Sequence, residues 1–355
     1  MKKRLDKKNH FFSIFDDKTG LYLRSNVLDN GKDTGIEPFM AEFPELLDVG
    51  IMGNCTHGKM GLCESAGIQC YQNGRDINQV NMAVEDFERI VGECKGRTFQ
   101  FALGGRGDPD QHEDFEEILK ICSENKIVPN FTSSGLGFDG RIINLCKRYC
   151  GAVAISWYRS RYTTDAIKAL TAAGIKTNIH YVLGKNTIDE GIKMLRDNGF
   201  PEGINAVVFL LHKPVGLGKA ENVLRCNDKK LNEFFRLAQE KRFPFKLGFD
   251  SCSVPGILNY MKCVDRDTID TCEGGRWSAY ISSDMKMMPC SFDNQEARWG
   301  VDLRHSTIEQ AWNSSEFDSF REHFKGACPD CANRKYCMGG CPISPEIVLC
   351  ENKSV

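Results

Sequence analysis

Short apolar runs and amphipathic segments alternate along the chain from residue 46 onward. The apolar runs have the length and composition of buried strands and lie at 46–52, 98–103, 127–132, 152–157, 176–183 and 205–211. The segments between them have helical spacing; in 82–94, for example, Val84, Phe87 and Val91 fall on one face. Six strand–helix units predict an α/β fold with a parallel sheet and right-handed crossovers. Six units are too few for a closed eight-stranded barrel, so an open (β/α)6 barrel and a doubly wound sheet both fit.

The alternation does not extend to the two ends of the chain. Residues 10–25 predict a β-hairpin, and 26–45 predict an ordered lead-in without regular structure. A seventh strand-like run at 243–250 is followed by cysteine-rich sequence. We therefore expect three parts, namely an N-terminal hairpin and lead-in (1–45), an α/β domain (46–250) and a cysteine-rich domain (251–355).

Charge and composition exclude several classes of partner. The formal net charge of the 355 residues is -2, which gives no electrostatic reason to expect nucleic acid or an anionic membrane. No apolar run has the length of a membrane span. The start, MKKRLDKKNHFF, lacks the apolar core of a secretory signal. Seventeen clustered cysteines in a long chain without an export signal are more typical of metal-bound thiolates in a reducing cytoplasm than of a disulfide scaffold.

The densest cysteine cluster is near the C-terminus. Five thiols fall within 23 residues, at Cys328, Cys331, Cys337, Cys341 and Cys350. So many thiolates without a matching set of histidines suit an iron–sulfur cluster or zinc.

A second group of thiols follows the first predicted strand. Cys55, Cys63 and Cys70 have the spacing C-x7-C-x6-C in a glycine-containing loop. Three thiolates on a cubane iron–sulfur cluster would leave one iron open to a substrate or cofactor. The alternatives are three unrelated thiols, or a zinc site with a fourth ligand such as His57.

A glycine-rich turn follows the second predicted strand. Gly104, Gly105 and Gly107 would let a ligand approach the backbone closely, and Asp108 offers a carboxylate to an amine. The turn has neither the spacing of a dinucleotide-binding motif nor the Lys-Ser/Thr pair of a P-loop.

These two loops together resemble the radical S-adenosylmethionine (SAM) superfamily. The resemblance implies a partial (β/α)6 barrel and a [4Fe–4S] cluster on Cys55, Cys63 and Cys70, although the usual spacing is C-x3-C-x2-C. It also implies that SAM chelates the open iron and contacts the glycine-rich turn, with Asp108 where a glutamate is common. Polar residues that match SAM-contacting positions are Ser134, Ser156 and Asn178. Each has an alternative interpretation as a strand-end side chain that satisfies the local backbone.

The C-terminal cysteines resemble the SPASM extension of this superfamily. All seven cysteines of its pattern are present: Cys272, Cys290, Cys328, Cys331, Cys337, Cys341 and Cys350. Met285 replaces a glycine of the pattern, which a turn tolerates if φ is negative there. The remaining thiols are expected to be small buried hydrophobic residues, at Cys94, Cys122, Cys146, Cys150 and Cys226.

The SPASM resemblance implies two auxiliary [4Fe–4S] clusters. One would use Cys328, Cys331, Cys337 and Cys350. The other would use Cys272, Cys290 and Cys341, completed by Cys252 or Cys263 unless one iron stays open. Cys252 is preferred because it directly follows a predicted strand.

The function implied is reductive cleavage of SAM to a 5′-deoxyadenosyl radical that abstracts hydrogen from a ribosomally made peptide and produces a crosslink or another modification. Partners would be the peptide or protein substrate and an electron donor such as flavodoxin or ferredoxin. A leader peptide would be bound by the barrel itself or by a separate leader-peptide-binding protein. One alternative is a sulfatase-type maturase with Asp293 as base, although an exposed turn aspartate is the simpler interpretation of that residue. Another is a non-enzymatic iron–sulfur or zinc protein.

Overall fold

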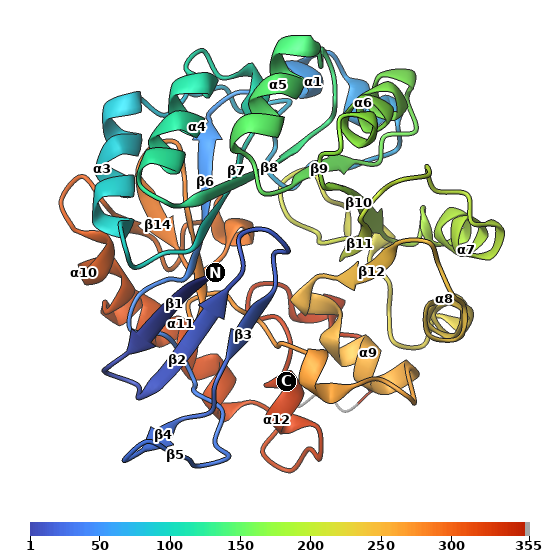
Figure 1. Cartoon of the computed structure of the whole chain (residues 1–355). Helices are drawn as coiled ribbons and strands as arrows, with labels where there is room; N and C mark the ends of the chain where they lie inside the picture. Colours follow the sequence, from blue (N-terminus) through green and yellow to red (C-terminus); the bar gives the residue numbers. More distant parts are fainter. Residues whose placement is uncertain (352–355) are drawn as a thin grey trace.

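The computed structural model describes residues 1–351, and a parallel sheet organises it (Figure 1). Its strands are β6 (Leu46–Met52), β7 (Gln100–Gly105), β8 (Val128–Ser133), β9 (Val153–Ser156), β10 (Thr177–Leu183), β11 (Ala206–Leu211) and β12 (Lys246–Phe249). They lie side by side in chain order. Right-handed crossovers that always step in the same direction place all their helices on one face of the sheet. The chain therefore forms the open barrel and not the doubly wound sheet.

Amphipathic helices cover the outer face of this barrel, as Figure 1 shows. They are α3 (Val84–Cys94), α4 (Phe115–Glu124), α5 (Gly140–Tyr149), α6 (Arg161–Ala172), α7 (Ile188–Asp197) and α8 (Lys229–Glu240). Side-chain caps fix where several of these helices begin. At α5 the Asp139 side chain accepts a hydrogen bond from Ile142 N, and at α6 the Ser160 side chain accepts one from Thr163 N.

Alternate residues of the strands separate an apolar core from a polar lumen. In β10, Ile179 and Tyr181 are buried against the helices, whereas Asn178 and His180 are only partly buried. In β8 the partly buried positions include Asn130 and Thr132. Because successive side chains of a strand point to opposite faces, these polar residues line the inside of the barrel.

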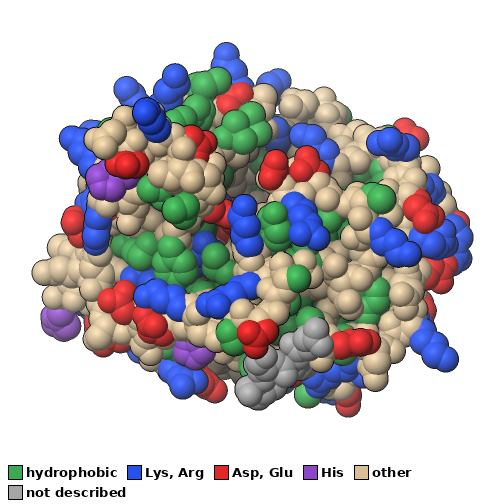
Figure 2. Space-filling model, turned by 90° about the horizontal axis from the view of Figure 1, so that it is seen from below, with side chains coloured by type: hydrophobic (Ala, Val, Ile, Leu, Met, Phe, Trp, Pro, Cys, Tyr) green, Lys and Arg blue, Asp and Glu red, His purple; other side chains and the backbone are tan. Residues whose placement is uncertain are grey.

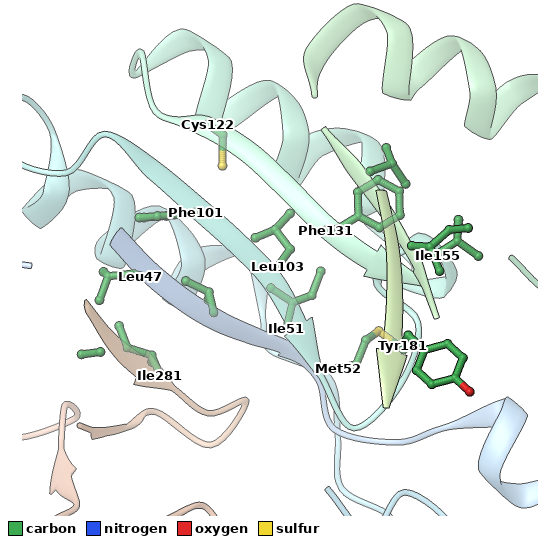
Figure 3. Packing of buried hydrophobic residues seen from close by; sticks show 14 of the residues in the cluster. Leu47, Ile51, Met52, Phe101, Leu103, Cys122, Phe131, Ile155, Tyr181 and Ile281 are labelled. Atoms are coloured by element: carbon green, nitrogen blue, oxygen red, sulfur yellow. The ribbon is translucent and has the colours of Figure 1, made fainter. Parts of the chain in front are cut away.

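The C-terminal region continues the same sheet. Strand β13 (Ser278–Ile281) pairs in parallel with β6, and β14 (Lys286–Met288) and β15 (Val301–Asp302) follow in antiparallel order. Leu47, Phe101 and Ile281, from three neighbouring strands, belong to one buried cluster (Figure 3). The helices of this region are α9 (Val254–Tyr260), α10 (Ile308–Trp312), α11 (Ser315–Gly326) and α12 (Arg334–Cys337). The boundary at residue 250 stays a prediction.

A small antiparallel sheet precedes the barrel. The hairpin predicted at 10–25 is present as β2 (Phe11–Phe15) and β3 (Tyr22–Arg24). The sequence pattern did not predict β1 (Lys2–Asp6), which pairs with β2. The expectation that 26–45 lacks regular structure is wrong in part, because this segment contains the short hairpin of β4 (Leu28–Asp29) and β5 (Lys32–Asp33). Phe11 packs edge-on against Trp277 at 5.7 Å and so attaches this sheet to the C-terminal region. Within residues 1–351, none of the helices combines the length and the apolar character needed to cross a membrane.

Candidate metal centres and cofactor site

The loop after β6 gathers the first three predicted thiols. Cys55 caps the short helix α1 (Thr56–Lys59), and its Sγ accepts a hydrogen bond from Gly58 N at 3.1 Å. Cys63 lies in α2 (Leu62–Ser65), and Cys70 follows that helix. Burial raises the pKa of Cys55 to about 11 and that of Cys63 to about 12, and the charge of Cys70 contributes to both shifts. The three thiols are therefore close enough to interact electrostatically.

Two glycines let this loop pack against its surroundings. A Cβ at Gly107 would lie 2.3 Å from the carbonyl oxygen of Asn54. A Cβ at Gly74 would lie 2.8 Å from Cβ of Cys55. Any side chain at either position would displace the backbone or the thiol that the loop presents.

The side chain of His57 contacts the thiol of Cys63. Its Nδ1 is 3.0 Å from Sγ of Cys63, and its Nε2 is 2.6 Å from Oη of Tyr162. Burial lowers the pKa of His57 to about 4, so the imidazole is neutral at pH 7. Tyr158 directs its hydroxyl toward the same sulfur at 3.8 Å.

The glycine-rich turn and Ser134 meet beside this loop. Gly105 has a φ of +111°, and a Cβ there would lie 2.4 Å from the Met52 carbonyl oxygen. Asp108 accepts two hydrogen bonds from Ser134, from its amide at 2.8 Å and from its hydroxyl at 2.6 Å. Gly104 and Gly105 are the last two residues of β7. The charge of Asp108 contributes to the raised pKa of Cys55, which places the carboxylate near the thiols.

Ser156 and Asn178 lie at different depths. Ser156 ends β9 and is level with His180 on β10. Asn178 is two residues nearer the start of β10, and its side-chain oxygen accepts a bond from Asn205 at 2.7 Å. Because the cysteine loop follows the carboxyl end of β6, Ser156 is the nearer of the two to it.

The second group of thiols forms where the barrel meets the C-terminal region. A hydrogen bond with Cys341, together with burial, holds the pKa of Cys252 well above its usual value. Burial raises the pKa of Cys272 to about 12, with a further contribution from Cys252. Burial also raises the pKa of Cys290, with contributions from Cys272 and Cys252. Cys263, by contrast, is exposed.

A third group lies around α12. Burial raises the pKa of Cys337 to about 11, and the charges of Cys350, Cys328 and Cys331 contribute. Four thiols from one 23-residue segment thus come together there. Cys252 thus lies near Cys341, Cys272 and Cys290, and the ligand sets of the two C-terminal groups stay a prediction.

The spacing of the thiols argues against single metal ions. Zinc binds sulfur at about 2.3 Å, so two sulfurs on one zinc ion are at most about 4.6 Å apart. Within residues 1–351, the one set of three potential ligand atoms that all lie within 4.8 Å of one another comes from His112, Glu113 and Asp114. The His112 nitrogens are already engaged by Met82 O and Asp114 N. In the described part of the chain, no three cysteine sulfurs lie this close together, so the thiol groups are spaced more widely than a single zinc ion requires.

Comparisons with known proteins agree with this geometry. Residues 272–333 match the SPASM family model, described as an iron-sulfur cluster-binding domain. SuiB from Streptococcus suis, crystallised with S-adenosylmethionine, matches with a TM-score of 0.65 and 16% identity, over 88% of this chain and 78% of that chain. Native anSMEcpe with bound AdoMet matches with a TM-score of 0.60 and 15% identity, over 88% of this chain and 92% of that chain. The chain has the radical SAM–SPASM fold.

Both proteins also match this chain in structures that contain peptides. SuiB was solved with its precursor peptide SuiA, and anSMEcpe with AdoMet and the Cp18Cys peptide. None of the curated proteins matches the sequence significantly. At these identities the likeness establishes the fold.

Within the SPASM region, Met285 differs from expectation. Its φ is +64°, so the expectation of a negative φ at this turn is wrong. Hydrogen bonds from Met285 N to Ser282 O, at 3.0 Å, and from Leu303 N to Met285 O, at 2.8 Å, hold the turn in this left-handed conformation. The side chain is 2% exposed, so its burial offsets the backbone strain.

Asp293 also differs from the exposed turn residue that we expected. It is 3% exposed, and its carboxylate accepts bonds from the amides of Arg298, at 3.1 Å, and Trp299, at 3.0 Å. Both oxygens therefore fasten the loop that precedes β15. The thiols expected in the core of the radical SAM–SPASM fold are buried at Cys94, Cys122 and Cys146 and partly buried at Cys150 and Cys226.

Several polar residues of the radical SAM–SPASM barrel were not among the predicted site residues. Asn130 donates to Gln100 at 3.0 Å, and Thr132 lies 3.4 Å from Nδ1 of His180. Burial lowers the pKa of His180 to about 4. The available signal was the alternation in VPNFTS and TNIHYVL, where every second residue is polar although the strand is central in the sheet.

Proposed function

We propose that this chain is a radical SAM enzyme that abstracts a hydrogen atom from a residue of a peptide and so modifies the peptide. The observation that carries the proposal is the three-thiol loop, whose sulfurs are spaced more widely than a single zinc ion requires and which lies beside a glycine-rich strand end above a polar lumen. A [4Fe–4S] cluster and SAM bound there would supply a 5′-deoxyadenosyl radical, which attacks unactivated carbon.

Each element of the site has a role in this proposal. Cys55, Cys63 and Cys70 would hold the cluster and leave one iron open. The glycines at the end of β7 would let SAM approach the backbone, and Asp108, aligned by Ser134, would receive its amine. The two C-terminal thiol groups would hold auxiliary [4Fe–4S] clusters, with Cys252 as the fourth ligand of the first.

The lumen would orient the substrate and exclude water. Its walls carry amide, hydroxyl and neutral imidazole groups, from residues such as Asn130, Thr132 and His180, which can hydrogen-bond a peptide without charging the cavity. Exclusion of water protects a carbon radical from side reactions. A peptide substrate is supported by the peptide-bound structures of SuiB and anSMEcpe.

Anaerobic reconstitution tests the proposal. We expect about 12 iron per chain, from three four-iron clusters. We also expect 5′-deoxyadenosine that forms only with a reductant, and a mass change in a short peptide encoded beside the gene and co-expressed with it. Zinc in place of iron, or full iron loading without SAM cleavage, would favour a non-enzymatic metal protein. Cleavage of SAM without any change in the peptide would contradict the peptide substrate.

No observation favours the sulfatase-type alternative. Its base was to be Asp293, whose two carboxylate oxygens already accept backbone amides. These two hydrogen bonds hold the loop, and Asp293 would have to give up at least one of them to accept a proton from a substrate.

A further inference from the structure

Strand β12 leaves one backbone edge of the barrel open. Its neighbour in the sheet is β11 alone. Lys246 N donates to Asn205 O and Asp250 N to Phe209 O, both at 3.0 Å. In a parallel pair, alternate residues face the neighbouring strand, so the amides and carbonyls of Leu247 and Phe249 point the other way. Among residues 1–351, no strand pairs with that side.

A groove of about 640 Å³ runs along this open edge. Its apolar lining comes from β12 and from α9 with the segment after it, namely from Leu247, Phe249, Val254, Ile257, Met261 and Ile269. Figure 2 shows one face of the molecule, where both acidic and basic side chains lie around a hollow. An exposed edge strand beside apolar pockets is the arrangement that binds an extended peptide by strand addition.

The ionisable side chains that line the groove are all carboxyl groups. Asp250, Asp270 and Glu273 line it, and no lysine or arginine does. Asp250 and Asp270 have cationic partners behind the wall, in Lys213 and Arg24. Arg24 and Arg276 are close enough to interact electrostatically with Glu273, but within the described part of the chain its carboxylate accepts no hydrogen bond. A cationic side chain in the groove would be a hydrogen-bonding partner for it.

The groove ends beside the candidate centres. Glu273 directly follows Cys272, and Asp250 is two residues before Cys252. A peptide strand paired with β12 advances about 3.3 Å per residue, so four residues would span the length of the strand. Such a peptide would have one end at the mouth of the lumen.

We propose that this groove binds the substrate peptide as an added strand on the open edge of β12, with a lysine or arginine of the peptide at Glu273. The inference rests on the proposed peptide-modifying function and specifies how the peptide is held. A second copy of this chain is a poorer occupant, because edge-to-edge pairing would bring two sets of carboxylates together.

Synthetic peptides test the proposal on the reconstituted full-length enzyme. The first probe is a fluorescein-labelled octapeptide in which every second residue is valine and the remaining residues are lysine or threonine. The second probe is the same peptide with glutamate in place of each lysine. We expect the lysine peptide to bind at least tenfold more tightly by fluorescence anisotropy. Equal binding of the two peptides, or no binding of either, overturns the proposal.

N-methylation tests strand addition directly. One version of the lysine peptide carries N-methyl groups on its odd residues, and the other on its even residues, so each blocks one edge of the strand. Strand addition predicts that one version loses at least tenfold in affinity and the other binds normally. Equal effects of the two versions would show that the peptide is not held as a strand.

Two matched variants locate the site. Met261→Arg places a cation in the groove, and Asn259→Arg places the same charge on the exposed side of α9. We expect only Met261→Arg to weaken the lysine peptide tenfold, with 5′-deoxyadenosine formation unchanged in both. If both variants bind the peptide like the wild type, or if Met261→Arg acts by dissociating a dimer, the proposal is overturned. Loss of SAM cleavage in the wild type would instead contradict the proposed function.

Discussion

The buried ion pair below the first C-terminal thiol group allows a sharp test of the structure. Nζ of Lys213 lies 2.7 Å from Oδ2 of Asp250, and the side chains are 1% and 15% exposed. Lys213 also donates to Leu211 O at 3.0 Å. Burial alone would lower the pKa of Lys213, but the Asp250 carboxylate, aided by Cys252, outweighs it and holds that pKa above its usual value.

The two ends of this pair should respond differently to mutation. Asp250→Asn leaves an ammonium group buried without an anion, which costs about 3–5 kcal/mol. Lys213→Met leaves a carboxylate that is less buried and still accepts bonds from Leu211 N and Ser253 Oγ, so the expected cost is about 1–3 kcal/mol. The double variant removes both charges and should cost about 2 kcal/mol less than the sum of the single variants.

Anaerobic thermal unfolding of the reconstituted protein measures these differences. For a chain of this size about 2 °C corresponds to each kcal/mol, so Asp250→Asn should lower the Tm by roughly 6–10 °C and Lys213→Met by roughly 2–6 °C. Asn259→Arg, on the exposed side of α9, serves as the control. A larger loss for Lys213→Met than for Asp250→Asn, or simple additivity in the double variant, would refute the reasoning.

Four further predictions concern the metal groups and the fold. Cys252→Ser should reduce iron by about one four-iron cluster, whereas Cys263→Ser should leave the iron content unchanged; equal losses would disprove the choice of ligand. Asp48 has its pKa raised by burial to about 6. Because the folded value lies above the unfolded one, its protonated form favours folding, and up to about 3 kcal/mol of stability present below pH 4 is lost as pH rises through 6. In denaturant titrations at a series of pH values, the free energy of unfolding of Asp48→Asn should not show that decline. If the pH profiles of the variant and the wild type are parallel, the raised pKa of Asp48 is not the cause. Gly107→Ala should abolish the iron of the three-thiol loop, measured as loss of SAM-responsive electron paramagnetic resonance, with near-native far-ultraviolet circular dichroism. At Met285, Gly and Ala variants both lose a buried side chain at about 2–5 kcal/mol, but Gly should be about 1 kcal/mol the more stable because it relieves the left-handed backbone; equal stabilities would mean that no strain is stored there.

Much of this architecture is predictable from local patterns. The apolar runs predicted the parallel strands of the barrel, because the apolar residues of each strand pack against the covering helices. The proposed memberships of the C-terminal thiol groups come from the resemblance to the SPASM extension, because Cys252, Cys290 and Cys341 are far apart in the sequence. The choice between the open barrel and the doubly wound sheet could not be made this way, because strand order depends on crossovers that no local pattern encodes.

Features that depend on tertiary contacts were not predictable. The positive φ of Met285 is imposed by hydrogen bonds to Ser282 and Leu303, and neither bond has a local signature. Asp293 resembles an ordinary turn residue until Trp299 folds back onto it. The lumen position of His180 becomes visible only when the sheet curves and one face of β10 is left without helices.

The sheet that joins barrel and SPASM strands has a consequence for biogenesis. Strand β6 pairs with β7 on one side and with β13 on the other, so half of its hydrogen-bonding capacity stays unsatisfied until the C-terminal region has been synthesised. During translation, a nascent chain long enough to form the barrel would still expose an apolar strand edge, which is a known route to aggregation. Chaperones and cluster-assembly factors would therefore have access to the three-thiol loop after β6 while one edge of β6 is still unpaired. Pairing with β13 would then complete the sheet next to that loop.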